Sequence, residues 1–279
     1  MPVDRLISPV CCALLLIVVF LNQDHAYAQA EDSQNVFDWY YSAVFGTGVY
    51  SVGGRDVAMF RVPYTRELWP GRESPNTLDL TVPVTLGVYA FEAEDIPNLR
   101  IEDVATATVF PGLVYRMPVT EHWRISPFIN IGYGKEFSVG EEALIYSAGV
   151  RSRGEFMSGD WRWLIGNALY YAGNTRDNIP DLGFGGFEMA VDASYPSPLQ
   201  FHGMSMRAGA YVAYYAFSDL EFVSPEDATV TVANQYELGL TLQSPQPMKV
   251  MGIGFDRVGI GYLRSEDLEA IRFVFSFPY

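Results

Sequence analysis

Large apolar residues occupy every second position along most of the chain, from about residue 55 to the C-terminus. The segment NTLDLTVPVTLGVYAF at 76–91 places Leu78, Leu80 and further aliphatic residues on one side, with threonine, aspartate and glycine on the other. Alternation with a period of two predicts β-strands that have one apolar face. This segment is longer than a typical globular strand and suits a tilted strand of ~9–11 residues that crosses a bilayer.

The same alternation recurs between segments rich in proline, glycine, aspartate and asparagine, which predict turns. It places strands at 55–65, 77–91, 103–117, 122–136, 142–153, 160–172, 185–195, 202–217, 229–243, 257–264 and 269–279. The apolar residues change side at Asp256 and Arg257, which requires either a bulge or a tight turn. A turn would make KVMGIGF at 249–255 a twelfth strand. Because closed membrane barrels prefer an even number of strands, the sequence predicts an all-β, twelve-stranded antiparallel barrel.

The N-terminal part of the chain follows different patterns. An apolar run at 10–21, followed by Ala26-Tyr27-Ala28, is typical of a signal peptide cleaved after Ala28. Apolar residues at helical spacing within 32–46 predict a short helix that would plug the barrel lumen, although a first strand or a disordered leader also fits. The predicted organisation is therefore a signal peptide at 1–28, a leader or plug helix at 29–53, and a barrel at 54–279.

Composition supports a membrane protein without nucleic-acid partners. Aromatic residues make up 15% of the chain and charged residues 18%, and abundant rings are typical of proteins that meet a lipid–water boundary. The formal net charge of −15 argues against nucleic acid as a partner. Both cysteines, Cys11 and Cys12, lie in the predicted signal peptide, so the mature chain has no disulfide or cysteine-based metal site.

The second face of the strands separates a membrane barrel from a soluble one. A soluble barrel keeps its apolar face inside and needs charge outside, whereas a transmembrane barrel has an apolar exterior and a polar lumen. Here the second face is rich in glycine, threonine and serine, with isolated charges. This pattern favours the transmembrane barrel over a soluble periplasmic β-sandwich. The residues predicted to face the lumen are Asp79, Arg124, Asn130, Asp192, Arg207 and Arg272.

The last strand predicts both closure of the barrel and an assembly signal. Backbone groups cannot remain unpaired in lipid, so the last strand is expected to pair with the first. Phe273, Phe275, Phe277 and Tyr279 alternate along EAIRFVFSFPY and are expected to face lipid. This ending resembles the C-terminal signal of bacterial outer-membrane proteins, which implies recognition by the barrel-assembly machinery. Pro278 departs from the simplest form of that signal because it lacks an N–H group.

A more specific resemblance covers about a quarter of the chain. VGIGYLRSEDLEAIRFVFSFPY at 258–279 and, more weakly, FRVPYTREL at 60–68 resemble the solitary autotransporter-like barrel family of outer membranes. The resemblance implies a twelve-stranded barrel like an autotransporter translocator domain, without a secreted passenger. It carries over no catalytic residue.

Several outer-membrane barrels are enzymes, so the candidate chemistry was weighed. His202 and Ser205 are three positions apart, and on a regular strand they point in opposite directions, which does not suit a catalytic pair. No phosphate-binding glycine loop or zinc-ligand spacing occurs, so no catalytic, cofactor or metal residue is predicted. The leading hypothesis is a non-enzymatic outer-membrane barrel with a conduit, structural, surface or translocator role. The alternatives are a lipid-modifying hydrolase and a small-solute porin.

Overall fold

The computed structural model of the chain describes most residues from 45 to 277. The described residues are 45–52, 55–70, 75–89, 104–137, 140–176, 179–201, 203–218, 221–223, 229–231, 233–250, 253–266 and 268–277. The predicted signal peptide and its cleavage at Ala28 lie outside these ranges. So does the predicted plug helix, apart from its last residues at 45 and 46.

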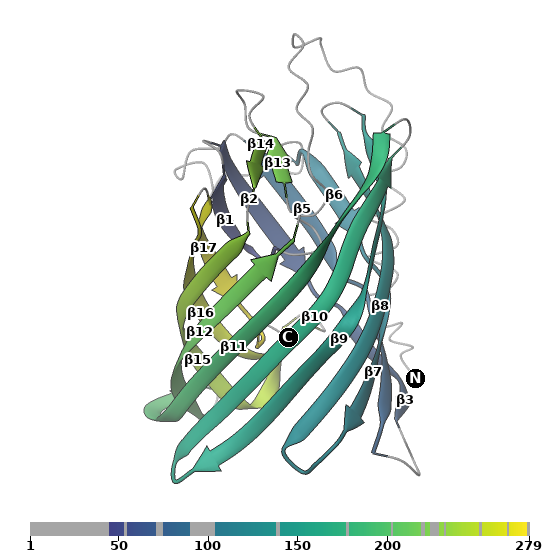
Figure 1. Cartoon of the computed structure of the whole chain (residues 1–279). Coiled ribbons are helices and arrows are strands. Elements are labelled where there is room, and N and C mark those ends of the chain that lie inside the picture. The colour runs from purple at the N-terminus through teal and green to yellow at the C-terminus, as the bar shows by residue number, and fades with distance from the viewer. Residues whose placement is uncertain are drawn as a thin grey trace, which may run out of the picture.

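The described residues form a closed antiparallel barrel of 12 strands, which confirms the predicted fold and strand number (Figure 1). Its segments are β1 (Gly48–Val52), β2 (Arg55–Val62), β3 (Thr65–Pro70), β4 (Thr77–Thr81), β5 (Val84–Tyr89), β6 (Thr106–Val109), β7 (Gly112–Pro118), β8 (Trp123–Glu136), β9 (Glu142–Ser158), β10 (Trp161–Arg176), β11 (Ile179–Phe201), β12 (Met204–Phe217), β15 (Asn234–Val250), β16 (Ile253–Arg264) and β17 (Leu268–Val274). A separate hairpin, β13 (Glu221–Val223) with β14 (Thr229–Thr231), lies between β12 and β15.

Three of the strands are each divided into two segments by a proline-containing break. Pro63 separates β2 from β3, Pro83 separates β4 from β5, and Pro111 separates β6 from β7. Proline cannot donate to the ladder, so it interrupts the pairing at each position. Three backbone hydrogen bonds still join neighbouring strands at these breaks. These bonds are Val82 N–H to the Tyr64 carbonyl at 2.7 Å, Phe110 N–H to Pro83 at 3.0 Å and Ile131 N–H to Pro111 at 2.9 Å.

The barrel closes where β1 pairs with β17, from Gly48 opposite Arg272 to Val52 opposite Leu268. The prediction that the last strand pairs with the first is therefore confirmed. The first strand, however, begins at Gly48, before the predicted barrel boundary at residue 54. The eleven predicted strands omitted β1, because GVYSV is short and is followed by two glycines that read as a turn.

The change of side at Asp256 and Arg257 comes from a bulge, one of the two predicted alternatives. Arg257 pairs with Gln243 and Phe255 pairs with Met248, so the residues at 244–247 of β15 lie opposite Asp256 alone. β15 ends at Val250 and β16 begins at Ile253, both within the segment that the alternative treated as a separate strand. The twelfth strand is therefore β1, and KVMGIGF is divided between β15 and β16.

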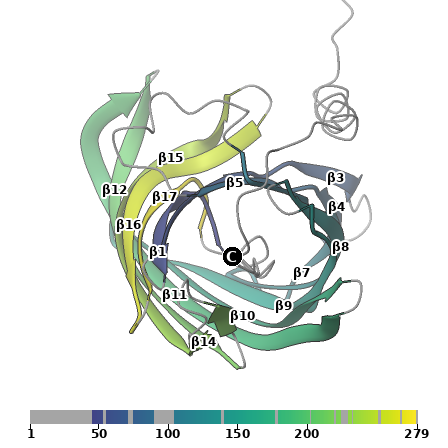
Figure 2. The same cartoon turned by 90° about the horizontal axis from the view of Figure 1, so that it is seen from above.

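The two ends of the barrel differ in their connections, as Figure 1 shows. Long connections at 90–105 and 218–233 join strands at one end, called the loop end here. Short turns at 119–122 and 159–160 join them at the other, called the turn end, where β11 also ends and β12 begins. Seen along its axis in Figure 2, the strands form a single ring.

The apolar face of the strands points outward. Leu169, Leu238 and Leu240 are about two-thirds exposed, at 66%, 63% and 66%, although they are large aliphatic residues in the middle of strands. Trp161, Trp163 and Tyr195 cluster near the turn end, and Tyr214 and Tyr236 cluster nearer the loop end. An apolar belt between two groups of rings is the exterior of a transmembrane barrel.

Buried polar residues and aromatic rings share the inward face. Toward the loop end, Phe184 and Phe217 pack edge to face, with ring centres 5.7 Å apart, beside Ile145, Leu263 and Leu268. The polar and charged residues buried inside the barrel include Asp79, Thr85, Asn130, Ser147, Asp192, Ser194, Gln235, Glu237, Thr241, Gln243 and Arg257. Apolar rings and charged groups therefore share the interior, with Glu237 nearer the loop end and the Asp192–Arg257 pair nearer the turn end.

Small residues on the inward face leave room for rings on the next strand. Tyr211 on β12 is paired with Gly239 on β15, and a Cβ atom at Gly239 would collide with the Tyr211 ring. Tyr170 on β10 lies over Gly186 on β11 in the same way. The glycine alternation therefore serves packing inside the lumen.

Replacing Gly239 by valine is expected to lower the free energy of unfolding by about 1–3 kcal/mol, because the new side chain displaces the Tyr211 ring in a packed interior. Urea unfolding of the protein in lipid vesicles measures the change. Gly254→Val is the control, since nothing lies within 4 Å of a Cβ atom at Gly254. Equal losses in the two variants would contradict the packing role of Gly239.

Candidate functional site

The barrel interior is the candidate functional site, and its first feature is a charge network around Glu237 on β15. Tyr211 and Tyr215 on β12 donate hydrogen bonds to the two carboxylate oxygens of Glu237, at 2.5 Å and 2.6 Å. Arg272 on β17 donates to Glu237 Oε2 at 2.6 Å and to the Tyr215 hydroxyl at 2.9 Å. Glu237 is buried, so the network offsets the free-energy cost of removing its carboxylate from water. It ties β12, β15 and β17 together across the lumen side of the wall.

A second network lies closer to the turn end. Arg257 on β16 donates to Asp192 Oδ2 on β11 at 2.9 Å, and Gln243 Nε2 on β15 donates to Asp192 Oδ1 at 2.8 Å. The side chains of Asp192 and Arg257 are 0% and 1% exposed, so the ion pair is fully removed from solvent. A buried pair is stable only when both charges keep their partners. The network fixes β11, β15 and β16 to one another, and this side of the lumen is closed to solvent.

The opposite wall of the lumen, on β7, β8 and β9, is more open. Arg116 on β7 forms an ion pair with Asp79 on β4 at 2.5 Å, and the Arg116 side chain is partly exposed. On β9, Arg151 lies over the Phe128 ring of β8, 4.1 Å from its centre. On the neighbouring strands, Tyr170 of β10 donates to Glu188 of β11 at 2.7 Å. The exposed part of the β7–β9 wall lies toward its turn end, whereas Phe128, Asn130 and Ser147 further along β8 and β9 are buried.

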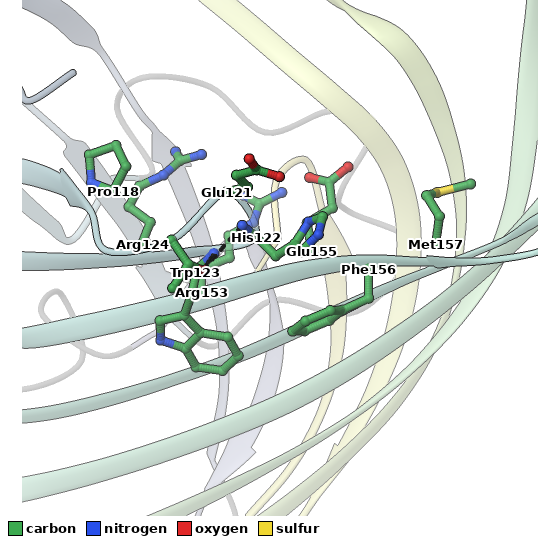
Figure 3. A pocket seen from close by; sticks show the side chains of 10 residues that line it. Pro118, Glu121, His122, Trp123, Arg124, Arg153, Glu155, Phe156 and Met157 are labelled. Carbon is green, nitrogen blue, oxygen red and sulfur yellow. Dashed lines mark hydrogen bonds between the residues drawn. The ribbon is translucent and has the colours of Figure 1, made fainter.

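A cavity of about 510 Å³ opens at the turn end of this wall (Figure 3). Its lining comes from the β7–β8 turn and from the ends of β8 and β9. In Figure 3 the Arg124 and Glu155 side chains point to one side of the ribbon, whereas the Trp123 and Phe156 rings point to the other. A second cavity of about 270 Å³ shares Pro118 and Arg124 with it. The two cavities together form the turn-end mouth of the lumen.

The residues predicted to face the lumen fall into separate groups. Asp192 and Arg272 belong to the two networks described above, and Asp79 is buried against Arg116. Asn130 on β8 donates to Ser147 on β9 at 2.9 Å. Arg207 donates to the carbonyls of Ser194 and Asp160 at 2.9 Å and 2.5 Å, and Arg124 lines the mouth. The structure does not bring these six residues into one site.

The C-terminal aromatic residues do not all lie on one face. Phe273 points outward and is 49% exposed, and the Phe275 ring lies 6.1 Å from that of Phe255. Phe277 is 2% exposed, and its ring centre lies 5.2 Å from the Arg153 guanidinium and 5.5 Å from that of Arg257. The expectation that Phe277 faces lipid is therefore wrong: β17 ends at Val274, so the alternation does not continue to this residue. Tyr279 lies outside the described residues.

The histidines and acidic residues form no catalytic or metal arrangement in the part of the chain that the structure describes. His122 lies beside Phe156, with ring centres 5.8 Å apart, at the turn-end mouth. His202 falls outside the described residues, so the predicted lack of a His202–Ser205 pair stays a prediction. Among the described side chains, no three histidine, cysteine or acidic residues come close enough to hold a metal ion. The described part also contains no helix that is long and apolar enough to span a membrane.

Several interior residues were not predicted from the sequence. Glu237 and Arg257 anchor the two networks, and Arg151 and Arg153 face the accessible part of the lumen. For Arg257 the signal was present, because it lies where the apolar residues change side. That change turns Arg257 inward, toward Asp192.

No protein-family model matches the sequence, and no curated protein is similar to it above the significance threshold. Among solved structures, the β domain of the Bordetella autotransporter Brka matches with a TM-score of 0.50 and 8% sequence identity, over 81% of this chain and 92% of that chain. The chain has an autotransporter-like barrel fold. The KdgM porin in complex with disordered oligogalacturonate covers 81% of this chain and 96% of that chain at 10% identity, with a TM-score of 0.33. The predicted resemblance to autotransporter-like barrels is confirmed for the fold.

Proposed function

We propose that this autotransporter-like barrel resides in the bacterial outer membrane and acts as a narrow conduit, without enzymatic activity. The observation that supports it best is the inversion of the two faces, with an apolar exterior and a lumen that contains charge networks. Long connections at one end and short turns at the other correspond to the extracellular and periplasmic sides of such barrels. The loop end is thus the cell surface, and the turn end opens to the periplasm.

The conduit runs along the accessible wall of β7–β9, from the turn-end mouth past Arg151. The opposite wall is held rigid by the Asp192 and Glu237 networks and contributes stability. Outer-membrane lipid is the partner of the exterior. The barrel-assembly machinery is the proposed partner during insertion, with Phe273, Phe275, Phe277 and Tyr279 as its signal.

Cell fractionation and planar-bilayer recording test this proposal. The protein is expected in the outer-membrane fraction, and the purified barrel is expected to give small, discrete conductance steps. Bilayers that receive detergent alone serve as the control. A protein that fractionates with soluble periplasmic markers, or that inserts without any conductance, would contradict the proposal.

A further inference from the structure

Two arginines face each other directly at the turn-end mouth. Arg124 on β8 and Arg153 on β9 are cross-strand partners in the ladder. Residues opposite each other on one face of an antiparallel pair have Cβ atoms about 4.5–5.5 Å apart, and like charges in this position destabilise the sheet. Arg151 lies two positions before Arg153 on β9, so its side chain points to the same inward face. Arg124, Arg153 and Arg151 are called the arginine column here.

No member of the arginine column forms an ion pair among the residues that the structure describes. Other arginines of the interior differ: Arg116, Arg257 and Arg272 each contact a carboxylate within 2.9 Å. Arg151 and Arg153 instead lie over the rings of Phe128 and Phe277. Glu155 also lines the mouth, but its carboxylate accepts a hydrogen bond from Arg162 at 2.7 Å. The barrel therefore neutralises its structural arginines through direct ion pairs, whereas this column has none among the described residues. Glu155, Asp256 and Glu188 act on the column electrostatically, but each is bonded to another side chain, namely Arg162, Arg257 and Tyr170.

The column is accessible from the turn end. Arg124 and Arg153 both line the 510 Å³ cavity, which is large enough for a small organic anion. Two guanidinium groups on neighbouring strands present several N–H donors toward one volume, and guanidinium groups match the paired oxygens of carboxylate and phosphate. A bound oxyanion would also relieve the repulsion between the two like charges.

We propose that Arg124 and Arg153 bind a soluble oxyanion, such as the carboxylate or phosphate group of a small solute, and that Arg151 receives it next along the lumen. The inference rests on the proposed conduit and adds its substrate class. An acidic chain of net charge −15 would thus carry a path for anions, because Arg124, Arg153 and Arg151 lie along one face of β8 and β9. The Trp123 and Phe156 rings also line this cavity, but they point to the other side of the ribbon from Arg124.

Phosphate binding to the purified barrel tests the site without requiring conductance. Inorganic phosphate, followed by calorimetry in a zwitterionic detergent, is expected to bind wild-type protein saturably. Arg124→Gln and Arg153→Gln are each expected to weaken binding by about tenfold to a hundredfold, because each removes a charge-assisted contact. Arg264→Gln is the matched control, since Arg264 is an exposed arginine near the loop end and pairs with Glu269 at 3.5 Å. Arg153→Lys is expected to bind more weakly than wild type and more strongly than Arg153→Gln.

The outcomes separate this proposal from the conduit. Reversal potentials in a potassium chloride gradient are expected to show anion preference in wild type and a shift toward cations in Arg153→Gln. Phosphate binding without conductance would overturn the conduit and keep the site. Conductance without phosphate binding, or equal binding by wild type and both glutamine variants, would overturn the site. A response to phosphatidylglycerol vesicles but not to phosphate would also overturn it, because the ligand would then be a lipid headgroup.

Urea unfolding with and without phosphate distinguishes a variant that has lost phosphate binding from one that folds poorly. Phosphate is expected to raise the stability of wild type and Arg264→Gln, since a ligand that binds only the folded state stabilises it. It is expected to leave Arg153→Gln unchanged. In phosphate-free buffer, Arg153→Gln is expected to be at least as stable as wild type, because one like charge is gone. A large loss of stability in that buffer would show that Arg153 is structural and would overturn the binding role.

Discussion

Replacing Asp192 by alanine is expected to lower the free energy of unfolding by about 3–5 kcal/mol, because Arg257 would stay buried without a counter-charge. Both side chains are almost fully buried, at 0% and 1% exposure, and lie 2.9 Å apart. Gln243 Nε2 would lose its bonds to the Asp192 carboxylate at the same time and keep the one to the Thr241 hydroxyl. Urea unfolding in lipid vesicles, followed by the mobility of the folded barrel on unheated gels, measures the loss.

Two further variants separate the buried charge from the loss of volume. The double variant Asp192→Leu with Arg257→Met removes both charges and keeps apolar volume, so it is expected to recover most of the stability. Glu269→Ala at the exposed pair with Arg264 is expected to change the free energy of unfolding by no more than about 1 kcal/mol. If Asp192→Ala were as mild as Glu269→Ala, the Asp192–Arg257 pair would not be a structural anchor.

Replacing Leu240 by arginine is expected to reduce the free energy of folding into a bilayer by about 2–4 kcal/mol. That is the cost of an arginine on the lipid face at the bilayer midplane. Leu240 is 66% exposed, and it is paired with Ile260 on β16 and Ala210 on β12, in the middle of the outer apolar belt. Folding yield and urea unfolding in vesicles of matched thickness report the loss.

Depth in the membrane supplies the control for Leu240→Arg. Leu199 is also an exposed leucine, but it lies near the turn end of β11, where the cost of arginine falls to about 0–1 kcal/mol. A soluble barrel would tolerate both substitutions equally, because arginine on a water-exposed surface is almost neutral. Equal tolerance would therefore contradict the membrane location of the outer face.

The barrel itself could be predicted from the sequence because its signal is local. Alternation along NTLDLTVPVTLGVYAF identifies strands without knowledge of their neighbours, and the choice of outer face follows from the size and polarity of each side. β1 was not predicted, because its five residues are too few to show a period of two. Phe277 was misplaced for a related reason, since alternation is informative only while the strand continues.

The interior networks could not be predicted in the same way, because they depend on register between distant strands. Asp192 was recognised as lumenal from its own strand, yet its partner Arg257 is 65 positions away, beside the register shift between β15 and β16. The position of Arg153 could not be predicted for the same reason, because it depends on register between strands. Only the β8–β9 register places it opposite Arg124, and neither residue stands out in the sequence.

The short pairing of β1 with β17 has a consequence for how the molecule is assembled. Every other neighbouring pair of barrel strands is adjacent in the sequence, so each such pair can form a hairpin through local contacts as the chain folds. The final contact instead joins segments from opposite ends of the chain, through the pairing of Gly48–Val52 with β17 and one backbone hydrogen bond from Phe273 N–H to the Thr47 carbonyl at 2.9 Å. This short pairing closes the curved sheet into a barrel and leaves no unpaired strand edge. Removing residues of either paired segment would therefore leave unpaired backbone N–H groups in the hydrocarbon of the membrane.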